Sequence, residues 1–100
     1  MNKKDKYELA IVGATGAVGR RMISILEERN FPVACLTVLA SARSAGKTLL
    51  FRGQAIEVKE LNEDSFKGVD IVLFAAGGPI SKQYAPIAVE SGCVVIDNSS

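Results

Sequence analysis

Three glycines, at positions 13, 16 and 19, stand between an apolar run and a stretch with helical periodicity. Residues 7–12 (YELAIV) predict a short buried strand. From Ala17 apolar side chains recur at helical spacing, and the predicted core face consists of Val18, Met22, Ile25 and Leu26. Asn30 and Pro32 end this helix, and residues 33–40 (VACLTVLA) predict a second strand. A strand, a helix and a strand within residues 7–40 indicate a βαβ unit, and this unit constrains the fold most.

The remainder of the chain departs from a regular βα repeat. Residues 48–51 (TLLF) and 55–58 (AIEV) flank RGQ and predict a hairpin where a second crossover helix would be expected. Residues 70–76 and 93–96 predict further buried strands, and residues 81–91 a helix that Pro86 either delays or kinks. The apolar runs do not alternate with polar residues, so both faces of the sheet should be covered. We therefore predict an α/β, Rossmann-type fold with a mostly parallel sheet, helices on both faces, and one crossover replaced by a hairpin.

Length and composition limit the possible functions. One hundred residues make one domain, residues 1–100. The net charge of +1 gives no reason to expect nucleic-acid or membrane binding, and no apolar run approaches the ~20 residues that span a bilayer. Histidine is absent from the sequence, and the two cysteines, Cys35 and Cys93, have no paired spacing. We expect neither a disulfide nor a metal site, and a cytoplasmic location fits best.

The glycine pattern predicts a dinucleotide site. Gly13 would let the chain turn off the strand, Gly16 would let a pyrophosphate approach the backbone, and Gly19 would let the helix pack close to the strand. The N-terminus of the helix favours an anion at the same place. The spacing is G-x-x-G-x-x-G, and its position inside a strand–turn–helix–strand unit gives it weight. The alternative is a glycine-rich turn without a ligand, whereas a P-loop is not indicated because no Gly-Lys-Ser/Thr follows.

The end of the second predicted strand bears on which dinucleotide binds. NAD-binding relatives of this fold usually carry Asp or Glu there, but residues 39–44 (LASARS) contain no carboxylate. Arg43 offers a forked donor, Ser41 and Ser44 offer hydroxyls, and Lys47 adds positive charge. The loop therefore predicts NADP rather than NAD. The alternative is a solvated polar loop in which Arg43 binds nothing.

Several segments together resemble a known family. IVGATGAVGRRMISILEERNFPV, LASARSAGK, FKGVDIVLFAAGG, SKQYAPIAVESG and VVIDNSS, between Glu8 and Ser100, resemble the N-terminal part of aspartate-β-semialdehyde dehydrogenase. With the glycine pattern, the resemblance implies cofactor-binding residues at Gly13, Thr15, Gly16, Ala17, Val18, Gly19, Arg43, Ser44, Ala76, Gly77, Gly78 and Asn98. Ser99 matches the same loop as Asn98, near the cofactor and the active site of the family.

The resemblance also implies an activity. Such enzymes interconvert L-aspartyl-4-phosphate and L-aspartate 4-semialdehyde with NADPH and phosphate, in cytoplasmic synthesis of lysine, threonine, methionine and diaminopimelate. They are commonly homodimers or homotetramers. Their catalytic cysteine, histidine and substrate-binding arginine belong to segments later than those matched here. We therefore expect no catalytic residue in this chain, no catalysis by it alone, and a truncated enzyme that carries the NADP-binding half.

Several alternatives stay open at this point. An N-acetyl-γ-glutamyl-phosphate reductase would have similar chemistry and a similar glycine loop, and a non-catalytic NADP-sensing module would need only the cofactor site. Extended short-chain dehydrogenases share the glycine spacing, but neither Tyr7 nor Tyr84 is followed by lysine four residues later. Cys35 and Cys93 are expected to be small buried side chains rather than nucleophiles. Asp97, which ends a strand at the ligand edge, is expected to be structural.

Overall fold

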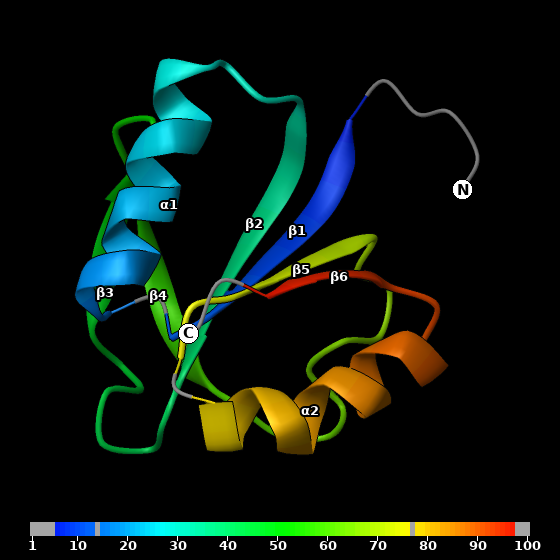
Figure 1. Cartoon of the computed structure of the whole chain (residues 1–100). Coiled ribbons are helices and arrows are strands. Elements are labelled where there is room, and N and C mark those ends of the chain that lie inside the picture. Colours follow the sequence, from blue (N-terminus) through cyan, green and yellow to red (C-terminus); the bar gives the residue numbers. More distant parts are fainter. Residues whose placement is uncertain (1–5, 14, 77, 98–100) are drawn as a thin grey trace.

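The protein forms one six-stranded sheet with the strand order β3-β4-β2-β1-β5-β6 (Figure 1). The computed structural model describes residues 6–13, 15–76 and 78–97. The elements are β1 Tyr7–Val12, α1 Ala17–Glu28, β2 Val33–Ala40, β3 Thr48–Phe51, β4 Gln54–Glu60, β5 Ile71–Phe74, α2 Gly78–Glu90 and β6 Val94–Asp97. Neighbouring strands are parallel except for the antiparallel pair β3–β4. The predicted mostly parallel α/β sheet is confirmed.

The two helices cover opposite faces of the sheet (Figure 1). Side chains of a strand alternate between faces, so Leu9 of β1 packs in one cluster with Ile23 of α1. The next residue, Ala10, packs in a second cluster with Ala88 of α2. The prediction of helices on both faces is therefore confirmed. In the described part of the chain, no helix is long and apolar enough to cross a membrane.

The predicted hairpin replaces the second crossover helix. β4 follows β3 through a tight turn in which Arg52 and Gly53 both have positive φ, +54° and +80°, and it then pairs in parallel with β2. Two positive φ values match a hairpin turn of the primed type. The backbone N–H of Arg52 donates to Glu27 at 2.7 Å, and its guanidinium donates to the carbonyl of Phe31. The hairpin is thereby attached to the C-terminal end of α1.

The core face of α1 differs from the predicted one. Gly19, Ile23 and Leu26 are buried, whereas Val18 is 39% exposed and Met22 is half-buried. Of the predicted set, Leu26 is buried and Met22 packs against the core, so the prediction was wrong for Val18 and missed Ile23. Val18 and Gly19 begin two adjacent stripes that converge on Leu26, and Gly19 has no side chain to mark the start of the buried one.

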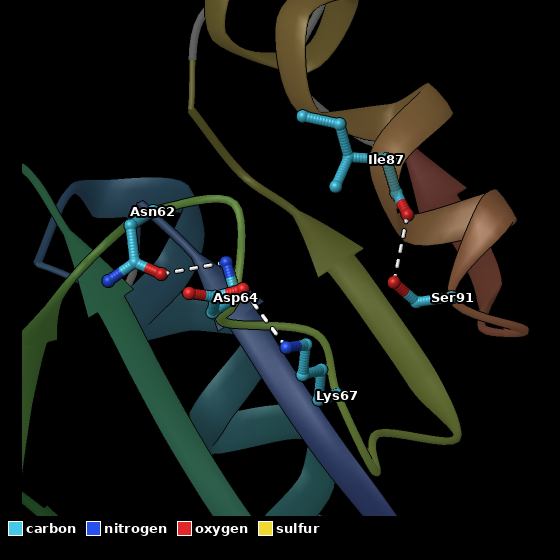
Figure 2. A network of polar contacts seen from close by, with 5 residues as sticks. All are labelled: Asn62, Asp64, Lys67, Ile87 and Ser91. Carbon is cyan, nitrogen blue, oxygen red and sulfur yellow. Dashed lines mark hydrogen bonds and ion pairs between the residues drawn. The ribbon is translucent and has the colours of Figure 1, made fainter.

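Helix α2 begins earlier than the predicted start at residue 81. It begins at Gly78, and Pro79 fits the first turn, where the N–H of a residue has no helical partner. Pro86 lies inside the helix rather than delaying it. At the C-terminal end the Ser91 hydroxyl donates to the carbonyl of Ile87 at 3.0 Å (Figure 2). Gly92, with φ +90°, follows and ends the helix.

The polar connection between β4 and β5 consists of turns. The side-chain oxygen of Asn62 accepts the N–H of Asp64 at 2.8 Å, and Lys67 pairs with Asp64 at 3.2 Å (Figure 2). Phe66, in the same segment, is fully buried, and its ring centroid lies 6.2 Å from that of Phe74. A segment that is polar in sequence thus contributes a central aromatic side chain to the α2 side of the core.

Candidate functional site

The candidate site lies at the carboxyl ends of β1, β2 and β5. After β1 the chain passes through α1 to β2, which lies on one side of β1 in the sheet. Strand β5, later in the sequence, lies on the other side of β1. Such a reversal of strand order leaves a crevice in which open α/β sheets bind ligands. A pocket of about 460 Å³ opens there, within the size range of small-molecule sites. The structure thus brings the glycine loop and the loops after β2 and β5 together.

Gly13 is required by the fold itself. Its φ is +85°, and its N–H donates to the carbonyl of Leu39 at 2.8 Å. A Cβ at this position would lie 2.7 Å from the backbone nitrogen of Ala76, closer than real contacts allow. The predicted sharp turn is confirmed, and the structure adds a close approach to the loop after β5. Both Gly13 and Ala76 line the pocket.

Gly16 has no such structural requirement. It is the N-cap of α1, with φ −79° and ψ 173°, and other residues adopt these angles without strain. Among the described residues, a Cβ on Gly16 would meet only the carbonyl oxygen of Gly13, at an ordinary 3.6 Å. Gly16 is exposed and lines the pocket together with Thr15. The space beside Gly16 is therefore free for a ligand atom.

The N-terminus of α1 presents positive charge to this space. Its cap makes no side-chain hydrogen bond, and its first turn holds no acidic residue, so the backbone N–H groups of Ala17 and Val18 stand at an uncapped helix end. Both residues are exposed, whereas Gly19 is buried in the helix. Arg20 adds a side-chain cation, because its Nε donates to the carbonyl of Thr15 at 3.1 Å. Sequence reasoning missed Arg20, although its place one turn after Gly16 was a signal.

The loop after β2 forms one wall of the pocket. Ser41 and Ser44 line the pocket, and the N–H of Ser44 donates to the carbonyl of Ser41 at 2.9 Å. Arg43 lies between them in the turn, exposed, and outside the pocket lining. Among the described residues it has no ion-pair partner. Lys47 is exposed as well, so both cations of this loop are accessible to a ligand phosphate.

The opposite wall is built by α2. Ile80, Gln83 and Tyr84 recur at helical spacing and line the pocket, and Leu61 closes it from the end of β4. The ring of Tyr84 meets that of Phe66 edge-on, with centroids 6.3 Å apart. Sequence analysis missed these four pocket residues. For the three on α2, their i, i+3, i+4 spacing was a signal.

The other predicted site residues differ in what the structure shows. Gly78 begins α2 but does not line the pocket, and Gly77 and Asn98 lie outside the described residues. Asp97 ends β6, and its Oδ2 accepts a hydrogen bond from the Ser81 hydroxyl at 2.6 Å. This contact gives Asp97 a structural partner on α2.

The two cysteines have different environments. Cys93 is buried, as expected, and its thiol lies 3.1 Å from the carbonyl oxygen of Val69. Burial, and then the negative charge of Asp70, raise the pKa of Cys93. The expectation of burial is wrong for Cys35, which is exposed. It lines a hollow of about 430 Å³ over β2 and β4.

Comparisons with known proteins agree with this arrangement. The family model described as "Semialdehyde dehydrogenase, NAD binding domain" matches residues 8–100. Aspartate-semialdehyde dehydrogenase of Legionella pneumophila is 59% identical over 92 residues, which cover 92% of this chain and 26% of the relative. Over these segments the sequence resemblance is confirmed.

Two solved structures give the same result. Aspartate semialdehyde dehydrogenase II from Vibrio cholerae, complexed with ASA, matches 93% of this chain and 30% of its own, with a TM-score of 0.89 and 52% identity. Aspartate semialdehyde dehydrogenase with NADP from Candida albicans matches 95% of this chain and 30% of its own, with a TM-score of 0.75 and 26% identity. The chain thus spans less than a third of the length of these relatives. It belongs to the semialdehyde dehydrogenase family and corresponds to the family's NAD-binding domain.

Proposed function

We propose that this chain is the NADP-binding part of an aspartate-semialdehyde dehydrogenase. The complete enzyme would convert L-aspartate 4-semialdehyde, phosphate and NADP to L-aspartyl-4-phosphate and NADPH. The observation that carries the cofactor assignment is Gly16, a pocket-lining glycine that neither its own φ nor its neighbours require. A glycine that the fold does not need is explained by a ligand that approaches its backbone.

The pocket walls suggest how the cofactor lies. A pyrophosphate would take the space beside Gly16, where the first turn of α1 offers N–H groups and Arg20 offers charge. The adenosine would fill the pocket between Ser44 and Tyr84. Arg43, accessible beside Ser44, would bind the 2′-phosphate. The Candida albicans relative, whose structure contains NADP, supports this choice of cofactor.

The residues of this chain bind and orient rather than react. Bound NADP supplies the hydride acceptor, and the nucleophile would come from another part of the complete enzyme. Cys93 is buried. Cys35 lies opposite Glu8 in the register of β1 and β2, near the start of β1 and away from the glycine loop. We further propose a cytoplasmic homodimer or homotetramer for the complete enzyme, on the basis of the family resemblance. The similarity to the Legionella pneumophila relative favours this assignment over an N-acetyl-γ-glutamyl-phosphate reductase or an NADP-sensing module.

Calorimetric titration of the chain with NADPH and NADH tests the proposal. Wild type should bind NADPH more tightly than NADH. Gly16→Val should abolish both, because the branched side chain would occupy the space of the pyrophosphate. Its unfolding temperature is measured alongside, so that a loss of binding is assessed only in a folded variant. Retained binding by a folded Gly16→Val variant would exclude the glycine loop as the site.

A further inference from the structure

The Ser81–Asp97 hydrogen bond joins two elements that reach the ligand edge. Ser81 lies in the first turn of α2, and Asp97 is the last residue of β6. The donor and acceptor oxygens are 2.6 Å apart, a short and charge-assisted bond. Among the described residues, Ser81 is the one polar side chain in the buried class, with 4% exposure. A buried hydroxyl needs a partner, and this one uses a carboxylate that the sequence analysis expected to be structural.

The sequence of α2 weakens its own hydrogen bonding close to this contact. Pro86 has no N–H, so the carbonyl of Lys82 lacks its usual intrahelical donor. The N-terminal turns of α2 are therefore held less firmly by the helix itself than those of an uninterrupted helix. The contact of Ser81 with Asp97 secures these turns against β6.

Two separate contacts thus hold the first turns of α2, made by side chains that are neighbours on its surface. The pocket-lining side is held by Tyr84, whose ring packs on the buried Phe66. The β6 side is held by Ser81 and Asp97. In the proposed orientation the adenosine lies on the Tyr84 side, and the pyrophosphate lies at the glycine loop. The other half of the dinucleotide then extends over β5 toward the carboxyl end of β6.

We propose that Ser81 and Asp97 form a positioning pair that fixes the first turn of α2 for the nicotinamide half of NADP. This inference rests on the proposed function. In the proposed orientation the pair lies away from the adenosine half. Loss of the pair should therefore weaken binding of the nicotinamide half and leave binding of the adenosine half unchanged. Two variants serve as matched controls. Ser91→Ala removes a hydrogen bond of a serine hydroxyl at the far end of the same helix. Asp70→Asn changes a carboxylate just before β5, at the end of the strands opposite to the pocket.

The test uses two probes, NADP and adenosine 2′,5′-bisphosphate, which lacks the nicotinamide half. Amide chemical shifts of the isotope-labelled chain, followed by NMR during titration, give both affinities. Ser81→Ala and Asp97→Ala should each weaken NADP about five- to tenfold, the effect of one hydrogen bond, and change the affinity for the bisphosphate less than about twofold. Asp97→Asn, which keeps an acceptor oxygen, should recover most of the affinity. Ser91→Ala and Asp70→Asn should leave both probes unaffected.

A combined variant tests whether the two residues act together. Ser81→Ala should weaken NADP no further when Asp97 is already alanine, because the bond is then lost. Equal weakening of both probes, or none of either, would overturn the positioning role while leaving the proposed function intact. Failure of wild type to bind either probe would instead overturn the proposed function, and the positioning role with it. If Ser81→Ala does not fold, Asp97→Ala at the exposed end of β6 decides the question.

Discussion

Replacing Gly13 by alanine should destabilise the fold through two separable effects. The first is conformational, because φ +85° is unfavourable for a residue with a Cβ and costs roughly 1–2 kcal/mol. The second is steric, because the new Cβ would lie 2.7 Å from the backbone nitrogen of Ala76 and 2.9 Å from its Cα. Backbone atoms cannot rotate away as a flexible side chain can, so the strands must shift, at a cost of about 1–3 kcal/mol.

Gly68→Ala separates these two effects. Gly68 has a similar φ of +77°, but a Cβ there would meet none of the described residues within 4 Å. This variant should lose only the conformational part, roughly 1–2 kcal/mol. Gly13→Ala should lose about 2–5 kcal/mol, a large fraction of the ~5–15 kcal/mol that stabilises a typical domain.

Urea unfolding followed by circular dichroism measures both free energies. For a domain of this size, each kcal/mol also lowers Tm by roughly 4–8 °C, so thermal unfolding gives a second estimate. The free energy of unfolding should be highest for wild type, lower for Gly68→Ala and lowest for Gly13→Ala. Equal losses for the two variants would refute the reasoning, because the close approach of Gly13 to Ala76 would then contribute nothing.

Three further predictions concern the cofactor, the core and the thiols. Arg43→Ala should weaken NADPH about tenfold in calorimetry and leave NADH nearly unchanged, and an equal loss for both would contradict the 2′-phosphate assignment. Phe66→Ala should cost about 3–5 kcal/mol in urea unfolding, because the ring is fully buried, and a loss below about 1 kcal/mol would argue against its central place. The raised pKa of Cys93 stabilises the fold below the ordinary thiol pKa of 9.0, and this contribution is lost as the pH rises through the raised value. Cys93→Ala should therefore flatten the decline of stability above about pH 9, and an unchanged slope would exclude the effect. In the folded protein Cys35 should react with a thiol reagent and Cys93 should not, and rapid modification of both would contradict the burial of Cys93.

The sheet and its order of elements could be predicted because each strand is a distinct apolar run. Residues 7–12 and 33–40 were predicted with the bounds that the structure shows for β1 and β2. The hairpin was found from RGQ, since a turn of two positive φ values favours glycine at position 53. Boundaries were less accurate where proline allows two interpretations: α2 begins at Gly78, just before Pro79, and not at the predicted residue 81.

What sequence reasoning could not find depends on contacts between distant elements. Ser81 has no feature that marks it as buried, and its partner Asp97 lies sixteen residues away on another element. The exposure of Cys35 follows from the absence of a helix over part of β2, not from its own neighbours in sequence. Tyr84 and Leu61 meet at the pocket only because β4 ends and α2 begins at the same edge of the sheet.

The glycine motif itself combines requirements that sequence alone does not separate. Gly13 is fixed by its positive φ and by Ala76, so it would be required even in a domain that bound nothing. Gly16 has ordinary angles and open space, so its lack of a side chain matters only when something approaches from outside. Gly13 is therefore a requirement of the fold, and Gly16 indicates a ligand. Because the two glycines serve different ends, Gly13→Ala should lower the free energy of unfolding whether or not a ligand is present, whereas Gly16→Val should act chiefly on ligand binding.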